Sequence, residues 1–143
     1  MLKTADAKYD LFISYAHKDA AYVNQLVVAL KEEGLRVWHD QGLLRLGEDL
    51  LAGIQLALET SRFYLLVISP NYLASEWANF ELGVALSRKQ PIIPLYLHPV
   101  VSTALPASIQ RLAGLSAQDA TPKQLAHELA QTIKHPAELK RAS

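Results

Sequence analysis

Two patterns of apolar residues alternate along the chain: continuous apolar runs, and segments in which apolar residues recur at helical intervals. Continuous apolar runs with many aromatic and β-branched residues predict four short strands, at Tyr9–Tyr15, Leu35–Trp38, Phe63–Ile68 and Ile92–Leu97. The segments between the runs repeat their apolar residues at helical intervals, which predicts amphipathic helices. Strands that alternate with helices are typical of an α/β protein with a parallel sheet.

Each predicted helix has an apolar face and, in most cases, a recognisable end. Asp19 is expected to cap the first helix and Gly34 to end it. A third helix is predicted from about Ser75 to Ser87, after a break at Ser69–Asn71, and a capping box with proline at its first helical position, Thr121–Gln124, starts the last helix. The apolar faces of the first, second and last helices are Val23, Leu26, Val27 and Leu30; Leu50, Ile54 and Leu58; and Leu125, Leu129 and Ile133.

The region from His98 to Asp119 is the least regular part of the pattern. A helical turn is expected near Ala107–Leu112 and a minimal fifth strand near Leu112–Leu115. Pro94 removes a hydrogen-bond donor from the fourth strand, which favours a position near the sheet edge. Five βα units predict a flavodoxin-like three-layer sandwich, with a five-stranded parallel sheet of order 2-1-3-4-5 and helices on both faces.

Ligands of such folds bind outside the carboxyl ends of the strands, beside the point where the strand order reverses. That rule directs the search for a site to four segments. They are Ser14–Lys18, His39–Asp49, Ser69–Glu81 and Tyr96–Val100.

Composition narrows the classes of protein to consider. The chain has 143 residues, half of them hydrophobic, which fits one packed domain; its formal net charge of zero argues against a dedicated nucleic-acid or anionic-membrane binder. The chain contains no cysteine, so it forms no disulfide and no thiolate site. No segment has the apolar pattern of a leader or a membrane span, so we expect a cytoplasmic domain. Its expected parts are a lead-in at 1–8, the domain at 9–135 and a polar tail at 136–143.

Several common catalytic sites have no support in the sequence. No glycine-rich phosphate loop follows a strand, and Ser14 and Ser69 lack the flanking glycines of a nucleophile elbow. The five histidines have no metal-site spacing; His17 and His39 end neighbouring strands, where a solvated pair is expected rather than a metal site. A phosphoacceptor receiver domain would need acidic residues where this chain has Tyr15-Ala16-His17 and Ser69-Pro70.

One pair of side chains after the third strand could form a pocket. Trp77 and Glu81 are four residues apart, so on a helix they share one face. A carboxylate beside an indole can be held in a partly dry pocket that tunes its protonation. By spacing alone, however, the pair is more typical of a packed helix with a solvated edge.

The order of several motifs resembles that of Toll/interleukin-1 receptor (TIR) domains, in the style of bacterial and plant members. Tyr9–Asp19 is similar to their first conserved box, and Leu35–Asp40 followed by Leu43–Glu48 is similar to their second strand and BB loop. Ile68–Tyr72, Ser75–Trp77 with Glu81, and Pro91–Leu95 resemble their third strand, the helix after it and the fourth strand. The resemblance runs from about Tyr9 to Ile133.

The resemblance implies an NAD⁺ glycohydrolase that releases nicotinamide and gives ADP-ribose or a cyclic isomer, in immune or virulence signalling. Glu81 takes the catalytic role, and no cofactor or metal is implied because NAD⁺ is the substrate. The implied substrate-binding residues are Trp77, Ser14, Tyr15, Trp38, Asp40, Leu44 and Gly47. Some members carry arginine after the first-box tyrosine, where this chain has Ala16 and His17; phosphate contacts would then fall to Lys18, Arg45 or backbone amides.

The resemblance also implies self-association and leaves a second function open. TIR–TIR contacts would involve the BB-loop residues Leu43, Leu44, Arg45, Leu46 and Gly47, and the active site would be completed across two protomers. A separate sensor domain or protein is a further implied partner. The alternative is a non-catalytic scaffold that signals through TIR–TIR contacts alone, in which the BB-loop leucines bind the partner and Glu81 has no catalytic role.

Overall fold

A computed structural model of the protein describes residues 8–38, 59–74, 83, 86, 91–98, 109, 112, 114–118 and 120–134. The elements in chain order are β1 (Tyr9–Ser14), the 3-10 turn η2 (His17–Asp19), α1 (Ala20–Glu32), β2 (Val37–Trp38), β3 (Ser61–Ile68), α3 (Pro70–Leu73), β4 (Ile92–Tyr96), β5 (Leu115–Ser116) and α6 (Pro122–Lys134). The sheet has the order β2-β1-β3-β4-β5, and every pair of neighbours is parallel. The predicted flavodoxin-like topology is therefore confirmed.

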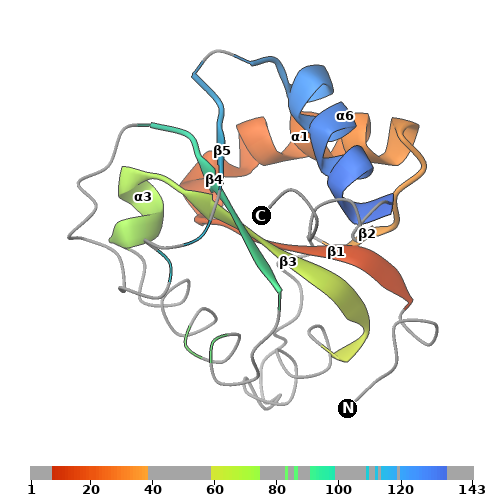
Figure 1. Ribbon diagram of the computed structural model, residues 1–143. Coiled ribbons are helices and arrows are strands. Elements are labelled where there is room, and N and C mark those ends of the chain that lie inside the picture. The colour runs from red at the N-terminus through yellow and green to blue at the C-terminus, as the bar shows by residue number, and fades with distance from the viewer. Residues whose placement is uncertain are drawn as a thin grey trace.

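Alternation of side chains along the strands divides the core between the two faces of the sheet. On one face, Leu11 and Ile13 of β1 and Leu65 and Val67 of β3 pack with the apolar faces of α1 and α6. These two helices lie side by side over that face (Figure 1). The predicted apolar residues of both helices are buried there, namely Val23, Leu26, Val27, Leu30, Leu125, Leu129 and Ile133.

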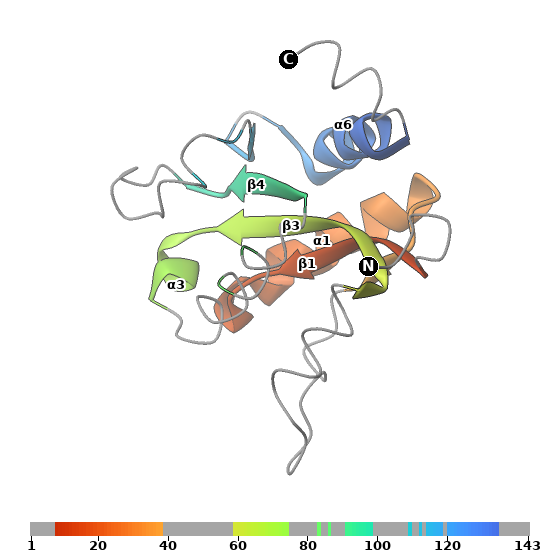
Figure 2. The same cartoon turned by 60° about the horizontal axis from the view of Figure 1, so that its bottom comes forward.

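The opposite face of the sheet has its own apolar cluster. Phe12 of β1 stacks on Tyr64 of β3 with ring centroids 5.5 Å apart, and Leu66 and Ile68 continue the cluster toward Tyr72 of α3. All of these side chains are buried. Figure 2 shows β1, β3 and β4 running in the same direction, with α3 at the arrow end of β3. The carboxyl ends of these strands thus meet at one edge of the sheet.

The ends of the two long helices follow the sequence signals. After α1, Gly34 has a φ of 87° and its amide donates to the Lys31 carbonyl, while the Leu35 amide donates to the Leu30 carbonyl. This pair of bonds is the Schellman ending that glycine favours. At the start of α6, the Thr121 side chain accepts from the Gln124 amide and the Gln124 side chain accepts from the Thr121 amide. The predicted capping box is confirmed.

Some predicted boundaries were wrong. The second strand is limited to Val37–Trp38, and the fifth strand lies at Leu115–Ser116, at the end of the range expected for it. The predicted break at Ser69–Asn71 is confirmed, since β3 ends at Ile68; the short helix α3, which Ser69 caps and which starts at Pro70, was not predicted. The position of Pro94 near the sheet edge is confirmed, since β4 is the second strand from the edge.

The close approach of β5 to β4 explains why residue 114 is glycine. A Cβ added to Gly114 would lie 2.7 Å from the Pro94 carbonyl oxygen, which is closer than any side chain tolerates. Glycine therefore lets the chain enter β5 directly beside Pro94.

Two predicted helical segments lie mostly outside the described residues. These are the second apolar face, Leu50, Ile54 and Leu58, and the predicted helix from Ser75 to Ser87, of which Gly83 and Leu86 are described and helical. Of the helical turn expected near Ala107–Leu112, Ile109 is helical and buried.

Candidate active site at the carboxyl ends of β1 and β3

The strand order reverses between β1 and β3, so this is the edge where a ligand crevice is expected. Ser14 ends β1 and lies in register with Leu66 of β3. Ser69 follows β3 directly, and both serines are buried, at 1% and 0% exposure. Small polar residues therefore end both central strands at the switch point.

A carboxylate bridges the two chain connections that leave this edge. Asp19, at the end of η2, accepts a hydrogen bond from the Ser69 hydroxyl at 2.5 Å and another from the Asn71 side-chain nitrogen at 2.9 Å. The Ser69 hydroxyl in turn accepts from the Tyr72 amide at 3.0 Å. The bridge joins the connection after β1 to the connection after β3.

Asp19 does not cap its helix as the sequence predicted. It occupies the position before Ala20, but its side chain makes no hydrogen bond to the first turn of α1. Its two oxygens accept from the β3–α3 connection instead. The local pattern identified the position correctly, and the long-range contacts decide what the side chain does.

The described candidates for substrate binding occupy different surroundings. Ser14 is on the same side of β1 as Phe12, by strand alternation. Tyr15 belongs to the opposite cluster, under α1 and α6, and only 8% of it is exposed. Because so little of Tyr15 is exposed, only a small part of this residue could contact a substrate.

Trp38 lies at the end of β2 and packs along β1. Its ring centroid is 5.1 Å from that of Tyr9 and 6.2 Å from that of Phe12. These contacts anchor the indole on the apolar face of the sheet, beside residues that precede Ser14. The predicted role of Trp38 at the crevice stays a prediction.

The remaining predicted site residues lie outside the described part of the chain. They are Glu81 and Trp77, together with Asp40 and the BB-loop residues Leu43, Leu44, Arg45, Leu46 and Gly47. Their roles in the site stay predictions.

Sequence reasoning missed the Asp19 bridge, although the signal was present. Asp19 and Asn71 are polar residues that closely follow the first and third strands, and the predicted strand order makes those strands neighbours. Combining the topology with the positions of both residues would have predicted their proximity.

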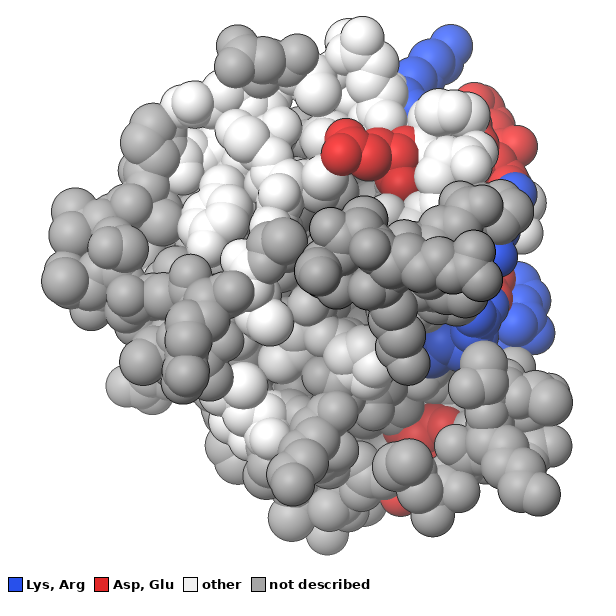
Figure 3. Space-filling view, in the orientation of Figure 1, with Lys and Arg blue, Asp and Glu red and all other residues white. Residues whose placement is uncertain are grey.

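A second carboxylate bridge lies at the opposite, amino-terminal end of the sheet. Asp10 of β1 accepts from the backbone amide of Arg36 at 2.9 Å, and its other oxygen lies 3.1 Å from the Arg36 guanidinium and 3.4 Å from that of Arg62 on β3. Arg62 also donates to the Ile133 carbonyl of α6. In Figure 3, acidic and basic side chains adjoin on the side of the molecule where β1 begins.

The arginines control the charge of this buried carboxyl. Burial disfavours its charged form, but the hydrogen bonds and positive charge of Arg36, with a further bond from Arg62, outweigh that effect and lower the pKa of Asp10. The same pairing raises the pKa of Arg36. The Asp10 bridge is accordingly a structural ion pair that is far from the predicted crevice.

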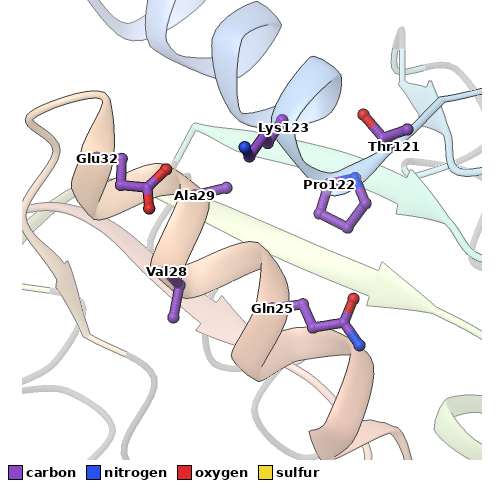
Figure 4. Close-up of a pocket in the computed structure, with 7 residues that line it drawn as sticks. All are labelled: Gln25, Val28, Ala29, Glu32, Thr121, Pro122 and Lys123. Atoms are coloured by element: carbon purple, nitrogen blue, oxygen red, sulfur yellow. The ribbon is translucent and has the colours of Figure 1, made fainter.

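The helix layer carries a hollow of its own. Gln25, Val28, Ala29 and Glu32 of α1 and the start of α6 line a groove of about 470 Å³, and Figure 4 shows its lining residues. None of the residues predicted for the site lines this groove. It carries no argument for the active site.

Within the ranges that the structure describes, no group of three or more potential metal-ligating side chains occurs. None of the helices found there is long and apolar enough to cross a membrane.

Comparison with known proteins identifies enzymes and a receptor among similar sequences. The chain is 29% identical over 136 residues to a 2' cyclic ADP-D-ribose synthase of Acinetobacter baumannii, covering 90% of this chain and 50% of that protein. It is 35% identical over 97 residues to an NAD(+) hydrolase of a Theionarchaea archaeon, covering 64% of this chain and 30% of that protein. It is also 30% identical over 117 residues to Toll-like receptor 6 of Bos taurus, covering 78% of this chain and 15% of the receptor. The chain thus spans half or less of the length of these relatives.

Solved structures and a family model give the same answer for the fold. A metazoan TIR-STING receptor from C. gigas superimposes with a TM-score of 0.73 at 24% identity, covering 93% of this chain and 41% of the receptor chain. The family model described as TIR domain matches residues 11–133, which is most of the chain. The chain therefore belongs to the TIR domain family.

Proposed function

We propose that this domain is an NAD⁺ glycohydrolase whose active site lies at the carboxyl ends of β1 and β3. The observation that carries the proposal is the similarity to relatives named NAD(+) hydrolase and 2' cyclic ADP-D-ribose synthase, within one shared domain family. The strand order supports the location, because it creates the switch point at which such folds bind ligands.

The reaction needs only one carboxylate. The bond between the ribose carbon and the nicotinamide nitrogen breaks with its electron pair going to the nitrogen. The nicotinamide ring, which is cationic in NAD⁺, thereby departs as neutral nicotinamide. Ordinary glycosidases need a second carboxyl to protonate an oxygen leaving group, and this leaving group needs no proton. Glu81 would stabilise the oxocarbenium-like transition state by its charge and by hydrogen bonds to the ribose hydroxyls.

Either of two acceptors completes the reaction. Water adds to the ribose carbon and loses a proton, which gives ADP-ribose; a hydroxyl or ring nitrogen of the same substrate would instead give a cyclic isomer. Trp77 would provide an aromatic wall for a flat ring. Ser14, Tyr15, Trp38, Asp40, Leu44 and Gly47 would border the crevice.

The test is nicotinamide release from NAD⁺ at high protein concentration. Wild type should release nicotinamide, and Glu81→Ala and Glu81→Gln should not. Glu32→Gln is the matched control, because Glu32 is an exposed carboxylate on α1 far from the strand ends. Nicotinamide release that survives both Glu81 substitutions would support an NAD⁺-cleaving enzyme but reject Glu81 as its catalytic residue. No release from folded wild type, even when clustered, would reject the enzyme.

Self-association through the BB loop belongs to the same proposal. If one protomer closes the active site of another, the specific activity should rise steeply with protein concentration. A chain that stays monomeric by analytical ultracentrifugation while fully active would contradict this.

A non-catalytic scaffold is the second candidate, favoured by the similarity to Toll-like receptor 6. In that case Leu46→Asp should abolish partner binding while Glu81→Gln leaves it intact. Binding that is unchanged in Leu46→Asp would count against the scaffold.

The cellular setting is part of the proposal as well. A cytoplasmic enzyme in immune or virulence signalling should deplete cellular NAD⁺ when expressed and activated, and the Glu81→Gln variant should not.

A further inference from the structure

We propose that Asp19 is a positioning residue for NAD⁺ cleavage, because it holds the connection that leaves β3 against the connection that leaves β1. This inference rests on the proposed function. Asp19 is not among the residues assigned to the site by resemblance, and the structure brings it to the switch point through its contacts with Ser69 and Asn71.

The bridge holds Ser69, the residue between β3 and α3, together with Asn71 and Tyr72 of α3. One oxygen of Asp19 accepts from the Ser69 hydroxyl, and the other accepts from the Asn71 side chain. Because the Ser69 hydroxyl donates to Asp19, it presents a lone pair to the Tyr72 amide, from which it accepts at 3.0 Å. A single carboxylate therefore sets the rotamer of the Ser69 cap and the start of α3.

The location makes this bridge relevant to the reaction. Ser69 directly follows the central strand β3, and the connection that it begins is the one that leads along the sequence to Trp77 and Glu81. A displacement of about 1 Å in catalytic groups can lower the rate by roughly a hundredfold. Fixing the origin of this connection is thus a way to hold the catalytic geometry.

The contacts favour a positioning role over a direct role in the reaction. Each carboxylate oxygen of Asp19 already accepts a hydrogen bond from a protein donor. An ion pair of the cationic nicotinamide ring of NAD⁺ with this carboxylate would compete with both bonds. The side chain acts on Ser69 and Asn71, and through them on the connection.

The structure offers a matched control at the other end of the same strands. Asp10 also joins β1 to its neighbours through hydrogen bonds to two residues, but at the amino-terminal end of the sheet. Removing either carboxylate should destabilise the domain. Only removal of Asp19 should affect the chemistry.

The experiment compares kcat and KM for nicotinamide release in wild type, Asp19→Ala, Asp19→Asn, Asp10→Ala and Glu81→Gln, at a temperature where all are folded. Asp19→Ala should lower kcat by about tenfold to a hundredfold with KM changed less than about threefold. Asp10→Ala should keep the wild-type kcat. Asp19→Asn should recover most of the loss, since its oxygen can accept from Ser69 and its amide can donate to a flipped Asn71 side chain.

Amide hydrogen exchange provides a readout that does not depend on activity. In Asp19→Ala the amides of Tyr72 and Leu73 should exchange about tenfold faster than in wild type, and in Asp10→Ala they should not. The Tyr72 amide bonds to the Ser69 side chain and the Leu73 amide to the Ser69 carbonyl, so both report on the cap.

The outcomes separate this inference from the proposed function. If wild type releases nicotinamide and Glu81→Gln does not, but Asp19→Ala matches wild type in kcat, the positioning role is wrong and the proposed function stands. Equal losses in Asp19→Ala and Asp19→Asn would also overturn it, because they would assign the effect to the charge. A folded wild type that releases no nicotinamide would refute both the proposed function and the positioning role. Unchanged amide hydrogen exchange at Tyr72 and Leu73 in Asp19→Ala would show that Asp19 does not hold the start of α3.

Discussion

Replacing Asp10 by Asn tests whether the ion-pair network at the amino-terminal end of the sheet stabilises the fold in the way that its geometry indicates. The carboxylate is largely buried, with 12% of the side chain exposed, and it accepts hydrogen bonds from both Arg36 and Arg62. Asn has nearly the same shape but no charge, so the substitution removes the ion pairs without leaving a cavity.

The magnitude follows from the two partners. A hydrogen bond to a charged group contributes about 1.5–3 kcal/mol when it is buried. The Arg36 side chain is 54% exposed, so water and salt screen its share, whereas the Arg62 side chain is 23% exposed and its pairing is screened less. We expect Asp10→Asn to lower the free energy of unfolding by about 1–3 kcal/mol at pH 7.

The same network predicts how the loss depends on pH. The pKa of Asp10 is lower in the folded state than its ordinary value, which is about 3.9 in an unfolded chain. Its stabilisation is therefore fully present above pH 4 to 5, and it is lost as the pH falls through the lower folded-state pKa. Protonated Asp and Asn are similar, so wild type and Asp10→Asn should converge in acid.

Urea denaturation of both proteins between pH 7 and the acid limit of folding measures this difference directly. The exposed carboxylate variant Glu32→Gln is the control and should differ little from wild type in stability at pH 7. A difference between wild type and Asp10→Asn that is below about 0.5 kcal/mol at pH 7, or that does not shrink in acid, would show that the ion pairs of Asp10 do not stabilise the fold in this way.

Two further substitutions test the helix ends by the same denaturation assay. Gly34→Ala should lower the free energy of unfolding by about 1–2 kcal/mol, because alanine is strained at a φ of 87°. Gly34→Asn should lower it less. Equal stability of Gly34→Ala and wild type would contradict the Schellman ending. Thr121→Ala should lower the free energy of unfolding by about 1 kcal/mol, because the Gln124 amide loses the side-chain acceptor that lies 3.1 Å away. Thr121→Ser should restore the stability. If it does not, the cap hydrogen bond is not what stabilises α6.

The parts of the fold that the sequence predicts well are those governed by local rules. The Schellman glycine Gly34 and the capping box at Thr121 depend on neighbouring residues, and both appear where the pattern placed them. The apolar run of β3 predicted a central strand, which is buried on both faces. Periodicity and turn chemistry suffice for such features.

The parts that the sequence predicts poorly depend on contacts between distant residues. The Asp19 side chain was expected to bond to its own helix, but it accepts from Ser69 and Asn71 instead, which follow the neighbouring strand β3 along the chain. The ring contacts of Trp38 with Tyr9 and Phe12 were not predicted, because they are determined by the register of β1 with β2. Neither partner set can be inferred from spacing along the chain.

We propose that this TIR domain cleaves NAD⁺ and that the carboxylate of Glu81 carries the chemistry. The most direct measurement is a proton NMR time course of NAD⁺ with concentrated wild-type protein beside Glu81→Gln. Wild type should produce free nicotinamide in large molar excess over the protein, while Glu81→Gln should leave NAD⁺ intact. Intact NAD⁺ in both samples, or equal nicotinamide release in both, would contradict it.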